Sequence, residues 1–213
     1  MTRVTRVKIC GTTTLHDLQV IEDAGADAFG VIVTDMDTPR GISTGEAQAL
    51  VAASSPLITS VLVCTPEHPV DAVPLVDTVE PDCVQIHGHH SPDAIQEAVE
   101  AFARPVIAVT DPTGLEAYRE GATGPAAVLV DSMTREGGGG TGRRVDIDRV
   151  EGVMDSVDVP CIIAGGLQPE NVRAVVTALR PYAVDVASGV EAAPGRKDPD
   201  AVRSFVAAAR EAF

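Results

Sequence analysis

The amino-acid sequence contains no uninterrupted apolar run that approaches the ~18 residues of a membrane-spanning helix. Its first residues, Met1 to Arg6, lead straight into a strand-like segment instead of the apolar core of a signal peptide. We therefore expect a cytoplasmic protein with no membrane partner. No linker separates two parts of the 213 residues, so we expect one domain over residues 1–213.

Lysine is almost missing: Lys8 and Lys197 are the only two, and arginine supplies the remaining basic charge. The formal net charge of −15 repels nucleic acid and argues against a polyanion-binding role. A lysine-poor, acidic surface suits a high-salt cytoplasm, where screening weakens self-repulsion. An acidic enzyme from ordinary salt is the alternative, and stability against KCl concentration separates the two. Aromatic residues are also scarce at 3%, which favours a monomer without excluding a homodimer.

The cysteine pattern gives no sign of a metal site. No CxxC pair is present, and no histidine is spaced from a cysteine as in zinc sites. We expect no metal and no organic cofactor. The simplest interpretation is that the cysteines other than Cys10 are small core residues; the four are Cys10, Cys64, Cys83 and Cys161.

Short apolar runs alternate with segments of helical spacing along the whole chain. Because strands that alternate with helices pair in parallel, this pattern predicts an α/β protein, most simply a closed (β/α)8 TIM barrel. An open doubly wound sheet is the alternative. Helices are expected to begin near Thr14, Ser43, Pro69, Ser91, Thr113, Asp146, Pro169 and Pro199. The expected strands are Val4–Cys10, Ala28–Val33, Leu57–Val63, Cys83–Ile86, Pro105–Val109, Ala126–Val130, Pro160–Ile163 and Ala183–Val186.

Two residues at the ends of expected strands are candidates for acid–base chemistry. Cys10 precedes Gly11 and a threonine-rich turn, where a thiol near a helix start is suited to act as a nucleophile or general base. Asp131 ends the run Ala-Ala-Val-Leu-Val-Asp, and the carboxyl ends of barrel strands carry active sites. The alternatives are a buried small residue for Cys10 and a loop cap for Asp131.

Strand parity places Lys8 on the same inward face as Cys10, and Asp185 on the inward face of the last strand. The first and last strands are neighbours in a closed barrel, and a buried unpaired charge is costly. We therefore predict a salt bridge between Lys8 and Asp185. Asp185 also joins the candidate substrate-binding residues.

Two glycine-containing segments follow the seventh and eighth expected strands. Glycine lets backbone amides approach an anion closely, and these two loops bind phosphate in many barrels. The candidate phosphate-binding residues are Gly165 and Gly166 in the first segment and Ser188 and Gly189 in the second. To these we add Gly140, Thr141 and Gly142 from the glycine run after the sixth strand, which reads either as a ligand-covering loop or as a plain connector.

Three further polar residues lie where ligand contacts are expected. Gln85 and His87 share a face at the end of the fourth strand and can hydrogen-bond a ligand or play a structural part. Arg40, in the loop after the second strand, is suited to bind a carboxylate through two hydrogen bonds, or stays solvated at the surface. His16, His68, His89 and His90 look like solvated residues.

Ordered motifs over nearly the whole chain resemble the phosphoribosylanthranilate isomerase family of tryptophan biosynthesis. They include Val7-Lys8-Ile9-Cys10-Gly11, Arg40-Gly41-Ile42-Ser43, Val84-Gln85-Ile86-His87-Gly88 and Leu129-Val130-Asp131-Ser132. Further motifs are Gly25-Ala26-Asp27-Ala28-Phe29-Gly30, Gly139-Gly140-Thr141-Gly142, Ala164-Gly165-Gly166-Leu167, Ser188-Gly189-Val190-Glu191 and Pro194-Gly195-Arg196-Lys197-Asp198.

The resemblance implies a (β/α)8 barrel that acts on the phosphosugar N-(5-phosphoribosyl)anthranilate. The implied reaction is an Amadori rearrangement to 1-(2-carboxyphenylamino)-1-deoxyribulose 5-phosphate. By position, Cys10 matches the family's general base, Asp131 its general acid, and Arg40 the arginine that holds the anthranilate carboxylate.

Two other functions remain open at this point. A histidine-pathway or dual-substrate isomerase performs the same rearrangement on a substrate with two phosphates, but such relatives generally have aspartate where this chain has Cys10. A barrel that binds a phosphorylated ligand without catalysis is the alternative of another class. The presence of both Cys10 and Asp131 argues against it.

Overall fold

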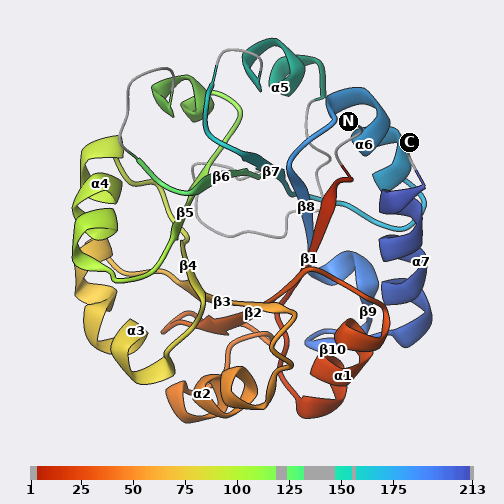
Figure 1. Cartoon of the computed structure of the whole chain (residues 1–213), viewed down its shortest axis with the longest axis horizontal. Coiled ribbons are helices and arrows are strands. Elements are labelled where there is room, and N and C mark those ends of the chain that lie inside the picture. Colours follow the sequence, from red (N-terminus) through yellow and green to blue (C-terminus); the bar gives the residue numbers. More distant parts are fainter. Residues whose placement is uncertain (1–3, 119–123, 132–146, 155–156, 212–213) are drawn as a thin grey trace.

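The computed structural model describes residues 4–118, 124–131, 147–154 and 157–211. Eight parallel strands close into a barrel in sequence order, and Figure 1 looks down into the ring they form. The expected TIM barrel is thus confirmed and the open sheet excluded. The strands are β1 (Arg6–Cys10), β2 (Ala28–Val33), β3 (Thr59–Cys64), β4 (Cys83–Ile86), β5 (Val106–Thr110), β6 (Ala127–Val130), β7 (Cys161–Ile163) and β8 (Ala183–Val186).

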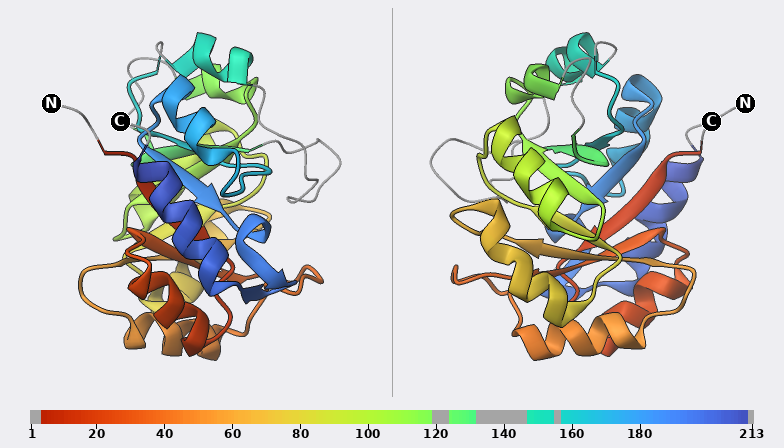
Figure 2. Two further views of the ribbon diagram at one scale, coloured as in Figure 1. Left: turned by 90° about the vertical axis from the view of Figure 1, so that its right-hand side faces the viewer. Right: turned by 60° about the vertical axis from the view of Figure 1, so that its left-hand side comes forward.

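Helices surround the barrel on the outside, and Figure 2 shows them from two further sides. Their apolar faces pack on the outward side chains of the strands, where Phe29 and Phe205 are fully buried. The α-helices are α1 (Leu15–Asp23), α2 (Thr44–Ala53), α3 (Val73–Val79), α4 (Pro92–Ala101), α5 (Ile147–Met154), α6 (Val172–Leu179) and α7 (Pro199–Arg210). Short 3-10 helices cover Pro69–Ala72, Gly114–Tyr118 and Ser188–Val190.

Helix starts follow from local hydrogen bonding in the sequence. Ser43 caps α2 through its hydroxyl, and Glu46 reaches back to the amide of Ser43, so both form a complete capping box. Ser91 caps α4 and Asp198 caps α7, each followed by a proline at the first helical position. These caps fix where the loops at the carboxyl ends of the strands turn into helices.

Alternation along each strand separates two apolar layers. Side chains such as Val61, Val63, Ile107 and Leu129 fill the barrel interior together with Cys10. Residues of opposite parity, such as Ile9, face the helices. The parity argument for Lys8 and Cys10 is therefore confirmed, and the register pairs Lys8 with Asp185 across β1 and β8.

The structure differs from the sequence prediction in local details. Leu57, expected to open the third strand, lies before it and is 94% exposed. The helix expected near Thr113 is a 3-10 helix over Gly114–Tyr118, and residues 119–123 lie outside the described part. The helix expected at Pro169 begins at Val172, because the preceding residues form a turn closed by Asn171, whose side-chain oxygen accepts from the Gln168 amide.

One pair of strands was not expected at all. After β8 the chain forms a small antiparallel sheet of β9 (Glu191–Ala193) and β10 (Arg196–Lys197). It lies next to the carboxyl ends of the barrel strands: Thr13 donates to the carbonyl of Gly195, and Lys197 donates to the carbonyl of Cys10. No helix in the described ranges is long and apolar enough to cross a membrane.

Candidate active site

A cavity of about 590 Å³ opens at the carboxyl ends of the barrel strands. Its walls come from the ends of β1, β2, β3, β4, β6 and β8 and from the loops that follow them. In barrels of this type the carboxyl ends of the strands carry the chemistry. Among the predicted site residues, the cavity wall contains Cys10, Arg40, Gln85, His87, Asp131, Asp185 and Ser188.

Cys10 is the last residue of β1 and is only 6% exposed. Gly30 lies beside it on β2, and a Cβ at Gly30 would stand 2.8 Å from the Cys10 sulfur and 3.2 Å from the Lys8 ammonium nitrogen. Burial raises the pKa of the Cys10 thiol, while the positive charges of Lys8 and Lys197 oppose that rise. The absence of a side chain at Gly30 is therefore what allows the thiol and the ammonium group to meet.

The predicted salt bridge between Lys8 and Asp185 is confirmed. The Lys8 Nζ donates to Asp185 Oδ1 at 2.8 Å, with side chains 4% and 10% exposed. Burial disfavours the charged form of Lys8, but the charges and hydrogen bonds of Asp185 and Cys10 together outweigh it and raise the pKa of Lys8 above its ordinary value. Lys8 thus stays charged beneath Cys10.

Arg40 is held by a carboxylate and not solvated at the surface. Its Nε and Nη2 donate to the two oxygens of Glu191, each at 2.8 Å. Its aliphatic part covers Gly11, where a Cβ would come within 2.9 Å of the Arg40 Cδ. The side chain is 22% exposed and lines the cavity.

Asp131 directly follows β6, and its amide donates to the carbonyl of Thr110 at 2.9 Å, which extends the sheet by one residue. It is half-buried and lines the cavity that also contains Cys10. The placement satisfies the first geometric requirement for an acid and a base acting on one ligand. Gly140, Thr141 and Gly142 lie outside the described residues.

The loops that carry Gly165, Gly166, Ser188 and Gly189 follow β7 and β8, and of these four residues the cavity wall contains Ser188. A Cβ at Gly189 would stand 1.9 Å from the carbonyl oxygen of Leu167, so the two loops are in direct contact. Gly165 and Gly166 have φ of +97° and +62°, which favour glycine. Within the described part of the chain, the amides of Gly165 and Gly166 have no backbone acceptor, as expected for an anion-binding loop.

Gln85 and His87 project into the cavity from β4 and the residue after it. Gln85 is 3% exposed, and its side-chain oxygen has no hydrogen-bond partner among the described residues. A buried acceptor without a donor is unfavourable, so Gln85 is suited to a ligand donor. Burial lowers the pKa of His87, and the charge of Lys8 lowers it further, which favours a neutral imidazole.

Several polar residues in the cavity wall were not among the predicted site residues, including Thr34, Thr65 and His90. Thr34 and Thr65 follow β2 and β3, and their hydroxyls hydrogen-bond each other at 2.6 Å. Both are polar residues that directly follow a barrel strand, and this position in the sequence is the signal that could have predicted them. His90, interpreted as solvated, is half-buried in the wall, with its Nε2 unpartnered within the described ranges.

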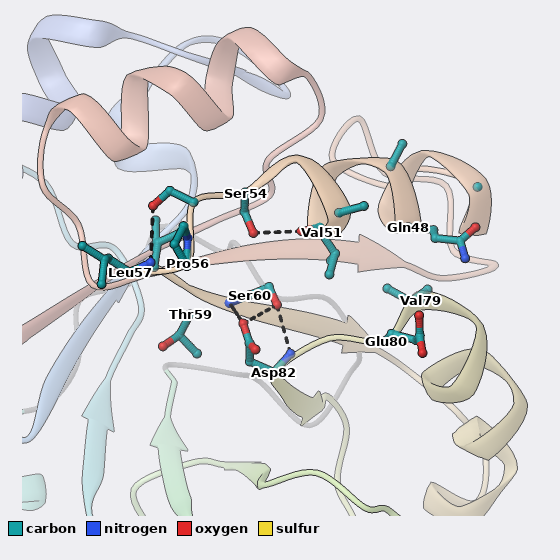
Figure 3. A pocket seen from close by; sticks show the side chains of 15 residues that line it. Gln48, Val51, Ser54, Pro56, Leu57, Thr59, Ser60, Val79, Glu80 and Asp82 are labelled. Carbon is teal, nitrogen blue, oxygen red and sulfur yellow. Dashed lines mark hydrogen bonds between the residues drawn. The ribbon is translucent and has the colours of Figure 1, made fainter.

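Two other cavities are less suited to chemistry. One, of about 870 Å³, lies at the opposite end of the barrel, around Arg6 and Tyr182. The other, of about 990 Å³, lies between α2, the start of β3 and the end of α3 (Figure 3). There the Asp82 carboxylate accepts from the amide and hydroxyl of Ser60, so this carboxylate is satisfied by the chain itself. Among the described side chains, no group of three or more His, Cys, Asp or Glu could hold a metal ion.

A thiol and a carboxyl group share this cavity at the carboxyl ends of parallel strands, an arrangement suited to a (β/α)8-barrel enzyme that uses acid–base chemistry. Comparisons with known proteins identify the enzyme family. The family model described as N-(5'phosphoribosyl)anthranilate (PRA) isomerase matches residues 7–208. The chain belongs to this isomerase family of tryptophan biosynthesis, which confirms the resemblance seen in the sequence motifs.

Individual relatives agree with this assignment. An N-(5'-phosphoribosyl)anthranilate isomerase from Natronomonas pharaonis is 49% identical over 207 residues, covering 97% of this chain and 98% of the relative. One from Haloarcula marismortui is 45% identical, covering 98% of each chain. Many of the similar proteins come from halophilic archaea.

Solved structures of the family superpose closely on the barrel. Phosphoribosyl anthranilate isomerase from Thermotoga maritima is 32% identical, with a TM-score of 0.84, covering 97% of this chain and 99% of that chain. A phosphoribosyl anthranilate isomerase in complex with reduced 1-(o-carboxyphenylamino)-1-deoxyribulose 5-phosphate has 30% identity and a TM-score of 0.81, with the same coverage.

Proposed function

We propose that the chain catalyses the Amadori rearrangement of N-(5'-phosphoribosyl)anthranilate to 1-(2-carboxyphenylamino)-1-deoxyribulose 5-phosphate, with Asp131 as general acid and Cys10 as general base. The observation that carries these roles is that Cys10 and Asp131 line one cavity, from β1 and from the residue after β6. The proposal takes residues 1–213 as one barrel domain that needs no cofactor.

The reaction requires two proton transfers at different atoms. Asp131 donates a proton to the furanose ring oxygen, so that the C1–O bond breaks and a Schiff base forms. The Cys10 thiolate then removes the proton from C2, which gives an enolamine that tautomerises to the ketone. Each transfer is worth about 10²–10⁴ in rate.

The charge around Cys10 supports its role as a base. A buried thiol alone has a raised pKa and little thiolate at neutral pH. Lys8 and Lys197 both favour the thiolate, and Lys8 is kept charged by Asp185. Because the pKa of Cys10 is nonetheless raised, we expect the thiolate fraction of Cys10 to increase from pH 7 to pH 9.

The remaining residues bind the substrate in this proposal. Arg40 receives the anthranilate carboxylate, since a guanidinium pairs with a carboxylate through two hydrogen bonds. The amides of Gly165, Gly166 and Gly189, with Ser188, bind the phosphate, together with Gly140, Thr141 and Gly142. Gln85, His87 and Asp185 contact the sugar. The phosphate acts as an anchor far from the reacting atoms.

The test follows anthranilate fluorescence while phosphoribosylanthranilate is generated in situ, at low and at molar KCl. The signal should decay with the purified protein and fall by about 10² or more in rate with Cys10→Ala or Asp131→Asn. Both variants should still bind reduced 1-(o-carboxyphenylamino)-1-deoxyribulose 5-phosphate. Loss of binding and turnover together would favour a binding barrel, and no decay at any salt would favour the histidine-pathway substrate.

The cell context and assembly belong to the same proposal. We expect the reaction in the cytoplasm, since the four cysteines are free thiols and that compartment keeps thiols reduced. We expect a monomer or a homodimer; one Thermotoga maritima relative is described as dimeric, with monomers generated from it. Sedimentation at molar KCl decides between the two.

A further inference from the structure

The small sheet after β8 holds a buried ionic cluster behind the cavity. Glu191 on β9 accepts from Arg40 through both oxygens and from Lys197 Nζ at 3.0 Å. The side chains of Glu191 and Lys197 are 4% and 0% exposed, and neither contributes to the cavity wall. They therefore lie behind Arg40 and act on the site through the residues they hold, and Lys197 acts also through its charge near Cys10.

Glu191 fixes the orientation of the Arg40 guanidinium. Its two oxygens engage the Nε and Nη2 side of the group. A guanidinium has five N–H donors, so the edge formed by Nη1 and the second Nη2 hydrogen stays available for another carboxylate. Gly195 sets the loop position, because a Cβ there would stand 2.2 Å from the carbonyl oxygen of Pro39, the residue before Arg40.

Lys197 has two effects in this arrangement. Its Nζ donates to the carbonyls of Cys10 at 2.6 Å and Ala187 at 3.1 Å and to Glu191, which uses all three N–H groups of an ammonium ion. It thus joins the ends of β1 and β8. Its charge also balances Glu191, so that the cluster of Arg40, Glu191 and Lys197 carries a net charge of about +1 and still attracts an anion.

The pKa values of the cluster are consistent with this charge balance. Burial acts to raise the pKa of Glu191, but the hydrogen bonds from Arg40 and the charge of Lys197 hold it below its ordinary value. Burial lowers the pKa of Lys197, and Glu191 opposes that change.

We propose that Glu191 and Lys197 are positioning residues, with Glu191 aiming Arg40 at the substrate carboxylate and Lys197 holding the Cys10 backbone while preserving the positive charge of the cluster. The inference rests on the proposed roles of Arg40 and Cys10. It assigns a task to the Glu191 and Pro194–Asp198 motifs, which the acid–base mechanism leaves without one.

A pair of probes isolates the effect on the carboxylate. The first is reduced 1-(o-carboxyphenylamino)-1-deoxyribulose 5-phosphate, and the second is the same compound with phenylamino in place of carboxyphenylamino. Calorimetric titration of wild type should show tighter binding of the first probe. Glu191→Gln should raise the Kd of the first probe about tenfold and change that of the second by no more than about twofold. Only the first probe has a carboxylate that binds the free edge of the Arg40 guanidinium.

Further variants make the test specific. Lys197→Met leaves the charge of Arg40 neutralised by Glu191, so it should also weaken binding of the first probe selectively. It should lower kcat as well, because the Cys10 carbonyl loses its donor. Asp200→Asn is the matched control, because it removes the carboxylate of an exposed ion pair with Arg203 on α7. It should leave the affinity for both probes unchanged. In turnover assays Glu191→Gln should raise KM more than it lowers kcat.

Equal weakening of both probes by Glu191→Gln, or no weakening of the first, overturns the inference. Where Glu191→Gln does not fold, Glu191→Asp is tested instead; its shorter carboxylate should give a smaller loss confined to the first probe, and an equal loss again overturns the inference. The probe titrations need no turnover. A wild type that binds the first probe more tightly but is inactive contradicts the proposed reaction while still testing the positioning roles.

Discussion

The buried pair of Lys8 and Asp185 should dominate the stability of the barrel interior. The two side chains share a 2.8 Å hydrogen bond and are 4% and 10% exposed, among apolar residues such as Val61 and Leu129. Removing one partner of a buried pair leaves a charge without compensation, at a cost of about 3–5 kcal/mol. Because the Cys10 thiol also lies beside Lys8 and can ionise, we expect Asp185→Asn to cost about 3 kcal/mol.

A double-mutant cycle separates the pair from its surroundings. Lys8→Met leaves Asp185 unpaired and should cost a similar amount, whereas Lys8→Met with Asp185→Asn leaves no buried charge. The double variant should therefore lose less than the sum of the single losses, by about 2 kcal/mol or more. The measurement is urea unfolding at fixed molar KCl. The exposed pair of Asp200 and Arg203 is the control and should show a much smaller coupling.

The pH dependence of the coupling follows from the direction of the Lys8 shift. The folded-state pKa of Lys8 is raised above its ordinary value, so its contribution is fully present below about pH 10 and is lost as the pH rises through the folded-state pKa. The coupling should be the same at pH 6 and pH 9. Single losses below about 1 kcal/mol with an additive double variant would refute the reasoning, as would a coupling that disappears between those pH values.

Two other perturbations test the site and the surface. Gly30→Ala would place a Cβ 2.8 Å from the Cys10 sulfur, so we expect kcat to fall at least about tenfold at a modest stability cost. Gly45→Ala is the control, because its Cβ meets nothing within 4 Å, and it should keep full activity. Equal kcat values for the two variants would contradict the role of Gly30. With a net charge of −15, the thermal midpoint should rise from low to molar KCl as screening reduces repulsion, and a flat curve would remove the high-salt interpretation of the composition.

Much of the barrel could be predicted because its information is local. Each strand is a short apolar run, and most helix starts have a side-chain cap or a proline, as at Ser43 and Asp198. Parity within a strand then predicts which side chains point inward. The pairing of Lys8 with Asp185 followed from parity and barrel closure alone, although 177 positions separate the two residues.

The arrangement around Arg40 could not be predicted in the same way. Its partner Glu191 lies 151 positions away, on a strand of only three residues with no periodic pattern to reveal it. From the sequence, Arg40 was expected either to bind a ligand carboxylate or to be solvated at the surface. In the structure, a carboxylate of the chain itself binds one side of the Arg40 guanidinium. Short loop strands depend on such tertiary contacts, since their own propensity is weak.

The positions of the two lysines connect the composition to the mechanism. In a chain that otherwise uses arginine for its basic charge, Lys8 and Lys197 are 3% and 4% exposed, and both lie against Cys10. Lys8 approaches the thiol within the narrow space left by Gly30, and Lys197 directs three hydrogen bonds from a single nitrogen. A planar guanidinium spreads its donors over three nitrogens and meets neither geometry. Lysine therefore stands where a compact ammonium ion fits beside the base, and we expect replacement of either residue by arginine to displace Cys10.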